Sequence, residues 1–183
     1  MVLDFAEKGL TTGIEQEQKQ INATKLNATR MKSLDKQAEL SPKVKQELDA
    51  IRDHWIWIVL VESWCGDGAQ NLPFIGKMAE YCPKIELRLI LRDEHKEVMN
   101  EFLTKGSRSV PKLICINAET RSMVGSWGPR SEEIQSRVIA FKRDYPDVPH
   151  EKFLEKLHGW YALDKGAALM KDFESLLEKW NQP

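Results

Sequence analysis

The chain has 183 residues, enough for one domain with a sizeable hydrophobic core that needs no metal or disulfide to hold it together. Its 27 Lys and Arg residues against 28 Asp and Glu residues give a net charge of −1, which argues against a protein that binds nucleic acid or an anionic membrane. The longest uncharged apolar run, residues 55–61, is far shorter than the ~20 residues of a membrane-spanning helix. The first residues lack the basic flank and apolar stretch of a secretory signal, so we expect a soluble, cytoplasmic protein.

The N-terminal part of the chain is polar and predicts helices. In segment 14–30, Ile14, Ile21 and Ala28 recur every seven residues, which is enough for a helix that lies on another unit but not for a core of its own. We expect a solvated helix here, in preference to a dedicated partner-binding arm. A further helix begins at Ser41, a favourable N-cap residue followed by proline, and its apolar stripe should pack against the domain that follows.

From residue 55 the pattern changes to alternating strands and helices. The first strand is a continuous apolar run rich in β-branched and aromatic residues, as is typical of a strand buried on both faces. A helix joins the first two strands and predicts a parallel pair, whereas a short turn joins the last two and predicts an antiparallel hairpin. We expect strands at 55–61, 85–91, 112–116 and 121–127, and helices at 69–82 and 94–105.

The sequence therefore divides into three parts. A helical N-terminal extension covers residues 1–54, and an α/β domain with a mixed sheet covers residues 55–142. A C-terminal helical extension, packed on the domain, covers residues 143–183. It contains the proline-containing linker 144–149, followed by apolar stripes at helical spacing.

The cysteines and histidines give no sign of a disulfide framework or a metal site. Cys65, Cys82 and Cys115 are odd in number and widely spaced, and the four histidines are scattered without the spacing of metal ligands. We therefore predict no bound metal and no cofactor, and each cysteine is interpreted as a thiol.

One cysteine stands where chemistry is favoured. In the run Trp64-Cys65-Gly66-Asp67-Gly68, the thiol lies between a buried strand and the start of a helix. Unpaired N–H groups and the helix dipole at that position stabilise a thiolate and lower its pKa, so Cys65 is a candidate nucleophile; the alternative is a structural, half-buried cysteine. A second feature, Val110-Pro111, directly precedes a strand, and such a bond can be cis.

The order of these elements over residues 55–142 resembles the thioredoxin superfamily. The runs ESWCGDGAQNLP, GSRSVPKL and GSWGPR are similar to a bacterial subgroup of that superfamily with a single-cysteine WCGDG motif and helical extensions. The resemblance implies a thioredoxin-like fold, a mixed sheet with helices on both faces, in which the WCG turn lies beside a cis-proline loop.

The resemblance also implies roles for individual residues. Trp64 would be the ring before the nucleophile, Cys65 the attacking thiol and Pro111 the cis-proline; these three are the candidate catalytic residues. The backbone of the residue before the proline would pair with an extended substrate, and the turn and a tryptophan after the hairpin would lie at the same surface. The candidate substrate-binding residues are therefore Val110, Gly66, Asp67, Gly68 and Trp127.

The sequence departs from the dithiol pattern at one position. Dithiol members have a second cysteine three positions after the first, where this chain has Gly68. At ~1.5 Å per helical residue, Cys82 lies about 20 Å or more from Cys65, and at ~3.3 Å per strand residue, Cys115 lies roughly 13 Å from the Val110-Pro111 loop. Bridged cysteines need Cα atoms within about 7 Å, so neither can resolve a mixed disulfide, and both are interpreted as core residues.

The proton acceptor of thioredoxins is also missing. The buried aspartate that those proteins place six residues before the first cysteine is Val59 here. Glu62 could serve as the base or could be a solvated carboxylate at a strand end. Asp67 would raise the pKa of Cys65 by charge repulsion while capping the helix, and the two effects oppose each other.

Two functions remain open at this point. The favoured one is a monothiol thiol–disulfide oxidoreductase in which Cys65 has a low pKa, attacks a protein or small-molecule disulfide, and is released by an external thiol. The alternative is a catalytically degenerate thioredoxin fold that binds a peptide or protein through the same groove. A third reading follows monothiol glutaredoxins, which can share an iron–sulfur cluster, but the glycine-rich glutathione contact of those proteins is not recognisable.

Overall fold

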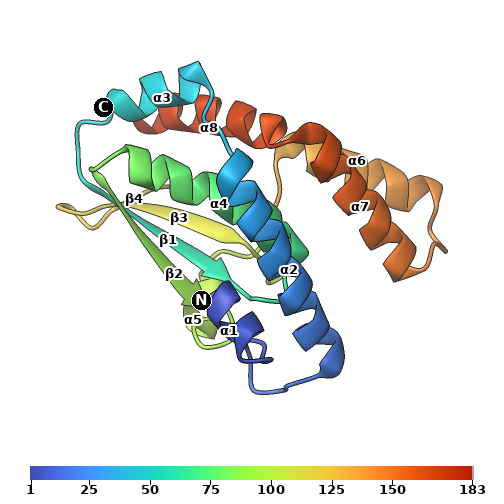
Figure 1. The fold of residues 1–183 in the computed structure, drawn as a ribbon. Coiled ribbons are helices and arrows are strands. Elements are labelled where there is room, and N and C mark those ends of the chain that lie inside the picture. The colour runs from blue at the N-terminus through green and yellow to red at the C-terminus, as the bar shows by residue number, and fades with distance from the viewer. Residues whose placement is uncertain (183) are drawn as a thin grey trace.

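The computed structural model describes residues 1–182 and shows an α/β fold around one four-stranded mixed sheet (Figure 1). Its order is β2-β1-β3-β4; β2 is parallel to β1, and β3 is antiparallel to both β1 and β4. The strands are β1 (Trp55–Val61), β2 (Ile85–Leu91), β3 (Lys112–Asn117) and β4 (Met123–Trp127). The predicted fold class is confirmed, including the parallel pair and the antiparallel hairpin.

Helices lie on both faces of the sheet. Helices α3, α4 and α8 share one apolar cluster with β1 and β3, whereas α5 closes part of the opposite face. Figure 1 shows α3 and α8 side by side above the sheet, and α6 and α7 to one side of it. The helices are α1 (Val2–Glu7), α2 (Gln18–Gln37), α3 (Pro42–Asp49), α4 (Gly66–Tyr81), α5 (Lys96–Glu101), α6 (Glu132–Asp144), α7 (His150–Asp164) and α8 (Ala167–Trp180).

Strand β1 is apolar throughout because successive side chains enter two different clusters. Trp57 and Val59 pack with the α3, α4 and α8 side chains, while Leu60 packs with Met99 of α5. The alternation of side chains along a strand thus buries both faces of β1. This central strand carries the turn that leads into α4.

Helix α7 joins the domain through a smaller cluster. Ile134 and Val138 of α6 pack with Phe153, Leu157 and Tyr161 of α7. The segment joining α6 to α7 is the predicted proline-containing linker, and it returns α7 toward the start of α4, where His158 and Tyr161 reach the turn.

Several predicted boundaries differ from the structure for local reasons. Helix α5 ends at Glu101 because Phe102 leaves the helical region, with φ −122° and ψ 37°; Lys105 and Gly106, with φ angles of 50° and 79°, lie in the turn that follows. Ile14 is fully exposed and lies outside α2, because residues 11–17 form a turn in which the Gln16 side chain bonds to the backbone of Thr11. Ser41 does cap α3, accepting a hydrogen bond from the amide of Val44. Within residues 1–182, no helix has the length and apolar character needed to cross a bilayer.

Candidate functional site

Cys65 lies at the junction of strand β1 and helix α4, where it occupies the N-cap position. The residue as a whole is partly exposed but its sulfur is largely buried, and the thiol donates a hydrogen bond to the carbonyl oxygen of Val110 at 3.2 Å. The Val110–Pro111 peptide bond is cis. The structure thus brings together the two segments, 45 residues apart, that the sequence placed at one surface.

Trp64 is half-buried beside the thiol-bearing residue. The guanidinium carbon of Arg92 lies 5.0 Å from the centre of its ring, a cation–π contact that holds the indole in place. Arg92 in turn pairs with Asp93 at the end of β2. Trp64 is therefore a fixed neighbour of Cys65.

The environment of Cys65 raises the pKa of its thiol to about 12. Burial of the sulfur is the largest cause and the nearby Asp67 carboxylate adds to it, while the amide groups of Gly68 and Asp67 and the charge of Arg130 act in the opposite direction. The predicted low pKa is therefore wrong: the helix N-terminus does favour a thiolate, but desolvation and a negative charge outweigh it. The resting group is a protonated thiol.

Asp67 is the centre of a buried polar cluster. Its two carboxylate oxygens accept hydrogen bonds from Arg130 at 2.6 and 2.9 Å, and one of them also accepts the hydroxyl of Tyr161 at 2.7 Å. The side chain of Asn71 completes the cluster by donating to the Asp67 backbone carbonyl. Asp67 therefore holds the 128–130 loop and α7 against the first turn of α4, and it is not the predicted helix cap, since Cys65 occupies that position.

Helix α7 covers part of the turn. An added Cβ at Gly66 would lie 2.8 Å from the His158 ring, so the glycine is required for α7 to approach α4. His158 also lies 3.3 Å from the amide nitrogen of Gln70, and burial lowers its pKa to about 4. Gly66 is consequently a contact residue between α4 and α7, and its role in substrate binding stays a prediction.

The N-terminal segment also holds the turn in place, through hydrogen bonds to Glu62 and Ser63. Thr12 donates its hydroxyl to the Glu62 carboxylate and accepts the amide of Ser63, and its own amide bonds to the Ser63 hydroxyl. Asn27 of α2 donates to the carbonyl oxygen of Ser63. These residues are buried, so the N-terminal extension is part of the site's framework and not the solvated helix that its polar sequence predicts.

Glu62 has its hydrogen bonds satisfied within the framework. One carboxylate oxygen accepts from Thr12 and the other accepts the amide of Asp93 at 2.9 Å. The side chain is only 2 % exposed. Glu62 is therefore buried, which corrects the reading of it as a solvated carboxylate, while its role as the base stays a prediction.

Gly68 lies next to the sulfur. A Cβ added there would be 3.7 Å from the Cβ of Cys65 and 4.0 Å from its Sγ. Disulfides join Cβ atoms that are about 3.5–4.5 Å apart. The turn therefore has the geometry of a dithiol site whose second side chain is absent.

The remaining candidates lie in the interior. Trp127 is 6 % exposed, packs on Phe173 of α8, and donates its indole N–H to Asp172 at 2.7 Å. It therefore anchors α8 and lines a pocket that does not include Cys65, and its role in substrate binding stays a prediction. Cys82 and Cys115 are buried free thiols, as the spacing argument predicted.

Sequence reasoning missed four residues of this site: Thr12, Arg130 as the partner of Asp67, His158 and Tyr161. Each lies far along the chain from the turn, and none carries a motif. A faint signal existed in GSWGPR, where a basic residue follows the second cis proline, Pro129. Among residues 1–182, no His, Cys, Asp and Glu side chains gather as a set of metal ligands.

The comparisons with known proteins agree with this fold. A family model described as thioredoxin matches residues 13–143, which is more than half of the chain. The chain belongs to this thioredoxin family. The match begins within the N-terminal segment, which is consistent with the contacts of residues 11–27 with the turn.

Two solved structures share the fold at low identity. A protein of unknown function from Pseudomonas aeruginosa has 17% identity and a TM-score of 0.62, over 96% of this chain and 89% of that one. An HIV epitope scaffold has 17% identity and a TM-score of 0.59, over 97% of this chain and 95% of that one. No curated protein matches the sequence.

Proposed function

We propose that the protein is a single-thiol member of the thioredoxin family in which Cys65 exchanges with disulfides and an external thiol completes the cycle. The observation that carries this proposal is the geometry at Gly68, where a side chain would begin 3.7 Å from the Cβ of Cys65. The turn retains the spacing of a dithiol centre, at the N-cap of a helix and against the cis-proline loop, but holds one sulfur.

The exchange has two steps. Deprotonated Cys65 attacks one sulfur of a substrate disulfide, forming a Cys65–substrate disulfide and releasing the other substrate sulfur as a thiolate. An external thiolate then attacks the substrate sulfur of that bond, regenerating Cys65 as a thiolate and leaving a disulfide between the substrate and the external thiol. Cys82 and Cys115 are both buried, so a small thiol of a reducing compartment such as the cytoplasm supplies the second step.

Proton loss from Cys65 also changes the loop that would hold a substrate. In the resting protein the Val110 carbonyl oxygen accepts a hydrogen bond from the Cys65 thiol. When the thiolate forms or the sulfur enters a mixed disulfide, this carbonyl is free to accept an N–H from an extended peptide. Substrate pairing with Val110 is therefore coupled to reaction at Cys65, with Trp64 and Pro111 flanking the sulfur.

The raised pKa sets the expected rate. At neutral pH a thiol whose pKa is about 12 is ionised far less than a free cysteine, so exchange is slow and speeds up with rising pH. Asp67 opposes ionisation and Arg130 offsets that effect, so the ion pair between them controls how readily Cys65 reacts.

The test restores the missing sulfur. Gly68→Cys should close a disulfide with Cys65 on oxidation. Once reduced and freed of reductant, this variant should reduce about one equivalent of a model peptide disulfide, its own two thiols supplying the electrons, whereas the wild-type protein should need an added small thiol. Gly68→Ser is the matched control, since it adds a side chain of similar size and no thiol. Loss of mixed-disulfide formation in Cys65→Ser, with retention in Cys82→Ala, identifies the reacting cysteine.

Two outcomes would contradict the proposal. One is a Gly68→Cys variant that folds, oxidises and still lacks reductase activity, because the site would then be more than one thiol short of a reductase. The other is a wild-type protein that forms no mixed disulfide at Cys65 even at alkaline pH.

A second function is favoured by the protonated thiol itself. A thioredoxin fold that binds an extended peptide without covalent chemistry needs no thiolate, and the raised pKa of Cys65 suits such a binding module. A partner found to bind the wild-type protein distinguishes the two. Non-covalent binding survives Cys65→Ala, whereas a mixed-disulfide partner is lost with the sulfur.

A further inference from the structure

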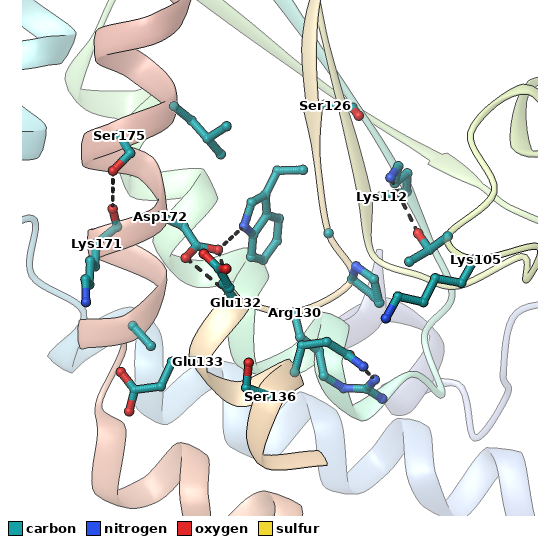
Figure 2. A pocket seen from close by; sticks show the side chains of 17 residues that line it. Lys105, Lys112, Ser126, Arg130, Glu132, Glu133, Ser136, Lys171, Asp172 and Ser175 are labelled. Atoms are coloured by element: carbon teal, nitrogen blue, oxygen red, sulfur yellow. Dashed lines mark hydrogen bonds between the residues drawn. The ribbon is translucent and has the colours of Figure 1, made fainter. Parts of the chain in front are cut away.

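A pocket of about 690 Å³ lies beside the end of β4, between the 128–130 loop and helices α6 and α8. Figure 2 shows Lys105 and Lys112 together at one end of this pocket, and Asp172 and Glu132 toward α8. Cys65 does not line it. Its chemistry can therefore be considered independently of the proposed thiol exchange.

The ammonium group of Lys112 is the exceptional feature of this pocket. Lys112 is only 9 % exposed, and burial lowers its pKa. Its contact within hydrogen-bonding range is the Thr104 hydroxyl at 3.5 Å, and no carboxylate of the described chain lies within 4.0 Å. A buried charge without a partner of opposite sign is costly, so buried lysines are normally paired.

Most of the other charges around the pocket have partners. Arg130 is occupied by Asp67 and by the side chain of Gln135. Asp172 accepts the indole N–H of Trp127 and the amide of Glu132. The carboxylates on the α8 side therefore do not neutralise Lys112.

Two of the cations without an ion pair in the described chain, Lys105 and Lys112, lie at one end of the pocket, whereas a third, Lys171, lies across it on α8 (Figure 2). Lys105 forms no ion pair within residues 1–182, and it lines the pocket beside Lys112 and Thr104. Since the Thr104 oxygen accepts from Lys112, its hydroxyl proton is free to donate to an anion. Two ammonium groups and a hydroxyl donor at one end, next to the apolar surfaces of Trp127 and Pro129, match an anionic head with an organic body.

We propose that this pocket binds a small anionic molecule whose carboxylate or phosphate group pairs with Lys112 and Lys105. The anion supplies the opposite charge that the buried ammonium lacks, and charge-assisted hydrogen bonds of this kind are among the stronger ones in proteins. The body of the ligand lies along Trp127 and Pro129.

The test measures thermal unfolding of the full chain with increasing inorganic phosphate in one series and acetate in another, at constant ionic strength set by chloride. A ligand that binds only the folded state raises the Tm in a saturable way. At least one series should saturate for the wild-type protein, and the series that saturates at lower concentration distinguishes phosphate from carboxylate.

Variants assign the effect to the ammonium group. Lys112→Met should weaken the response at least about tenfold, whereas Lys112→Arg should retain it. Lys96→Met is the matched control, because Lys96 is an exposed lysine outside the pocket. Removing the unpaired charge should leave the fold intact, and Lys105→Gln provides a second, exposed variant that should weaken the response. A wild-type response that never saturates with either anion, or an equal response in Lys112→Met, would overturn the proposal.

Discussion

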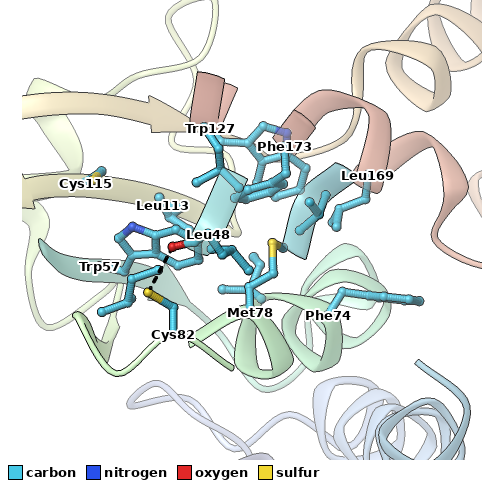
Figure 3. Packing of buried hydrophobic residues seen from close by; sticks show 14 of the residues in the cluster. Leu48, Trp57, Phe74, Met78, Cys82, Leu113, Cys115, Trp127, Leu169 and Phe173 are labelled. Atoms are coloured by element: carbon cyan, nitrogen blue, oxygen red, sulfur yellow. Dashed lines mark hydrogen bonds between the residues drawn. The ribbon is translucent and has the colours of Figure 1, made fainter. Parts of the chain in front are cut away.

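The two ends of helix α4 are held in opposite ways. At its first turn, Asp67 and Asn71 bind polar groups of the 128–130 loop and α7. Farther along, Phe74, Ile75 and Met78 enter the apolar cluster (Figure 3). A single helix thus joins a hydrogen-bonded polar site to a hydrophobic core. The difference shows that the reactivity of Cys65 is set by burial of its sulfur together with the charges and hydrogen bonds at the first turn, while overall stability is set by apolar packing.

The apolar end is built from aromatic rings of β1 and α8. Trp57 lies against Phe173 with ring centres 5.7 Å apart, and Trp180 meets Trp55 edge to face at 6.2 Å. Such pairs contribute beyond the area that they bury. Strand β4 reaches this cluster only because Gly125 leaves room for the Trp180 indole.

The largest expected effect is therefore at Gly125. In Gly125→Ala the new Cβ would meet the Trp180 indole nitrogen at less than any normal contact distance, forcing α8 away from the sheet. We expect a loss of about 3 kcal/mol or more in the free energy of unfolding. Gly159→Ala, which adds a methyl group to α7 with nothing near it, should instead stabilise by roughly 0.5–1 kcal/mol. Urea denaturation measures both, and equal stability of the two variants would contradict this packing.

The next effect is a pH dependence at the polar end. His158 has a pKa of about 4 in the folded protein, against ~6.5 when unfolded, because burial disfavours its charged form and Arg30 repels it. Below about pH 6.5 the unfolded state binds the proton and the folded state does not, so stability falls as the pH drops from roughly 6.5 to 4. Because His158 is only partly buried, solvent screening limits this loss to about 2 kcal/mol.

The variant His158→Gln isolates this contribution. A neutral side chain cannot titrate, so the fall in unfolding free energy across this window should be smaller by most of that amount than in the wild-type protein. Chemical denaturation at a series of pH values gives the two curves. If the unfolding free energies of the wild-type protein and His158→Gln fell in parallel with pH, His158 would not be buried as a neutral group.

The smallest expected effect on the free energy of unfolding is at Gly66 of α4, with Gly76 of the same helix as its control. Gly66→Ala places a Cβ 2.8 Å from the His158 ring and should destabilise by about 1–2 kcal/mol as α7 moves away. In Gly76→Ala the new Cβ would meet no atom within 4 Å, so this variant should stabilise the protein by roughly 0.5–1 kcal/mol. Opposite signs in thermal unfolding would support the close approach of α7, and a stabilising Gly66→Ala would refute it.

The same division decides what could be predicted from the sequence. The apolar packing around α4 could be predicted because apolar residues in β1 and α8 recur with the period of a strand and of a helix. In α8 these residues are Leu169, Phe173 and Trp180. These predictions rest on short-range patterns that burial enforces. The placement of Cys65 beside Val110 was instead implied by the resemblance to thioredoxins.

The polar contacts at the first turn of α4 could not be predicted in this way. The partners of Asp67, Glu62 and Gly66 lie 31 to 94 residues away, and a single hydrogen bond imposes no repeating pattern on the sequence. The pKa of Cys65 was mispredicted for the same reason, since the helix N-terminus is visible in the sequence whereas burial by distant segments is not. Polar residues such as Thr12 are typical of solvated segments, so their burial was unexpected.

The central claim is that Cys65 is an exchange site whose proton is retained by burial and by Asp67. The most direct measurement is the rate at which an aromatic disulfide reagent labels Cys65 as a function of pH, with mass spectrometry to identify the labelled cysteine, in the wild-type protein and in Asp67→Asn. We predict labelling of Cys65 alone, a rate that rises about tenfold per pH unit from roughly pH 7 to 10 without a plateau, and a rate about tenfold higher in Asp67→Asn. A plateau below about pH 8.5, or an Asp67→Asn variant that folds normally and reacts no faster, would contradict the account.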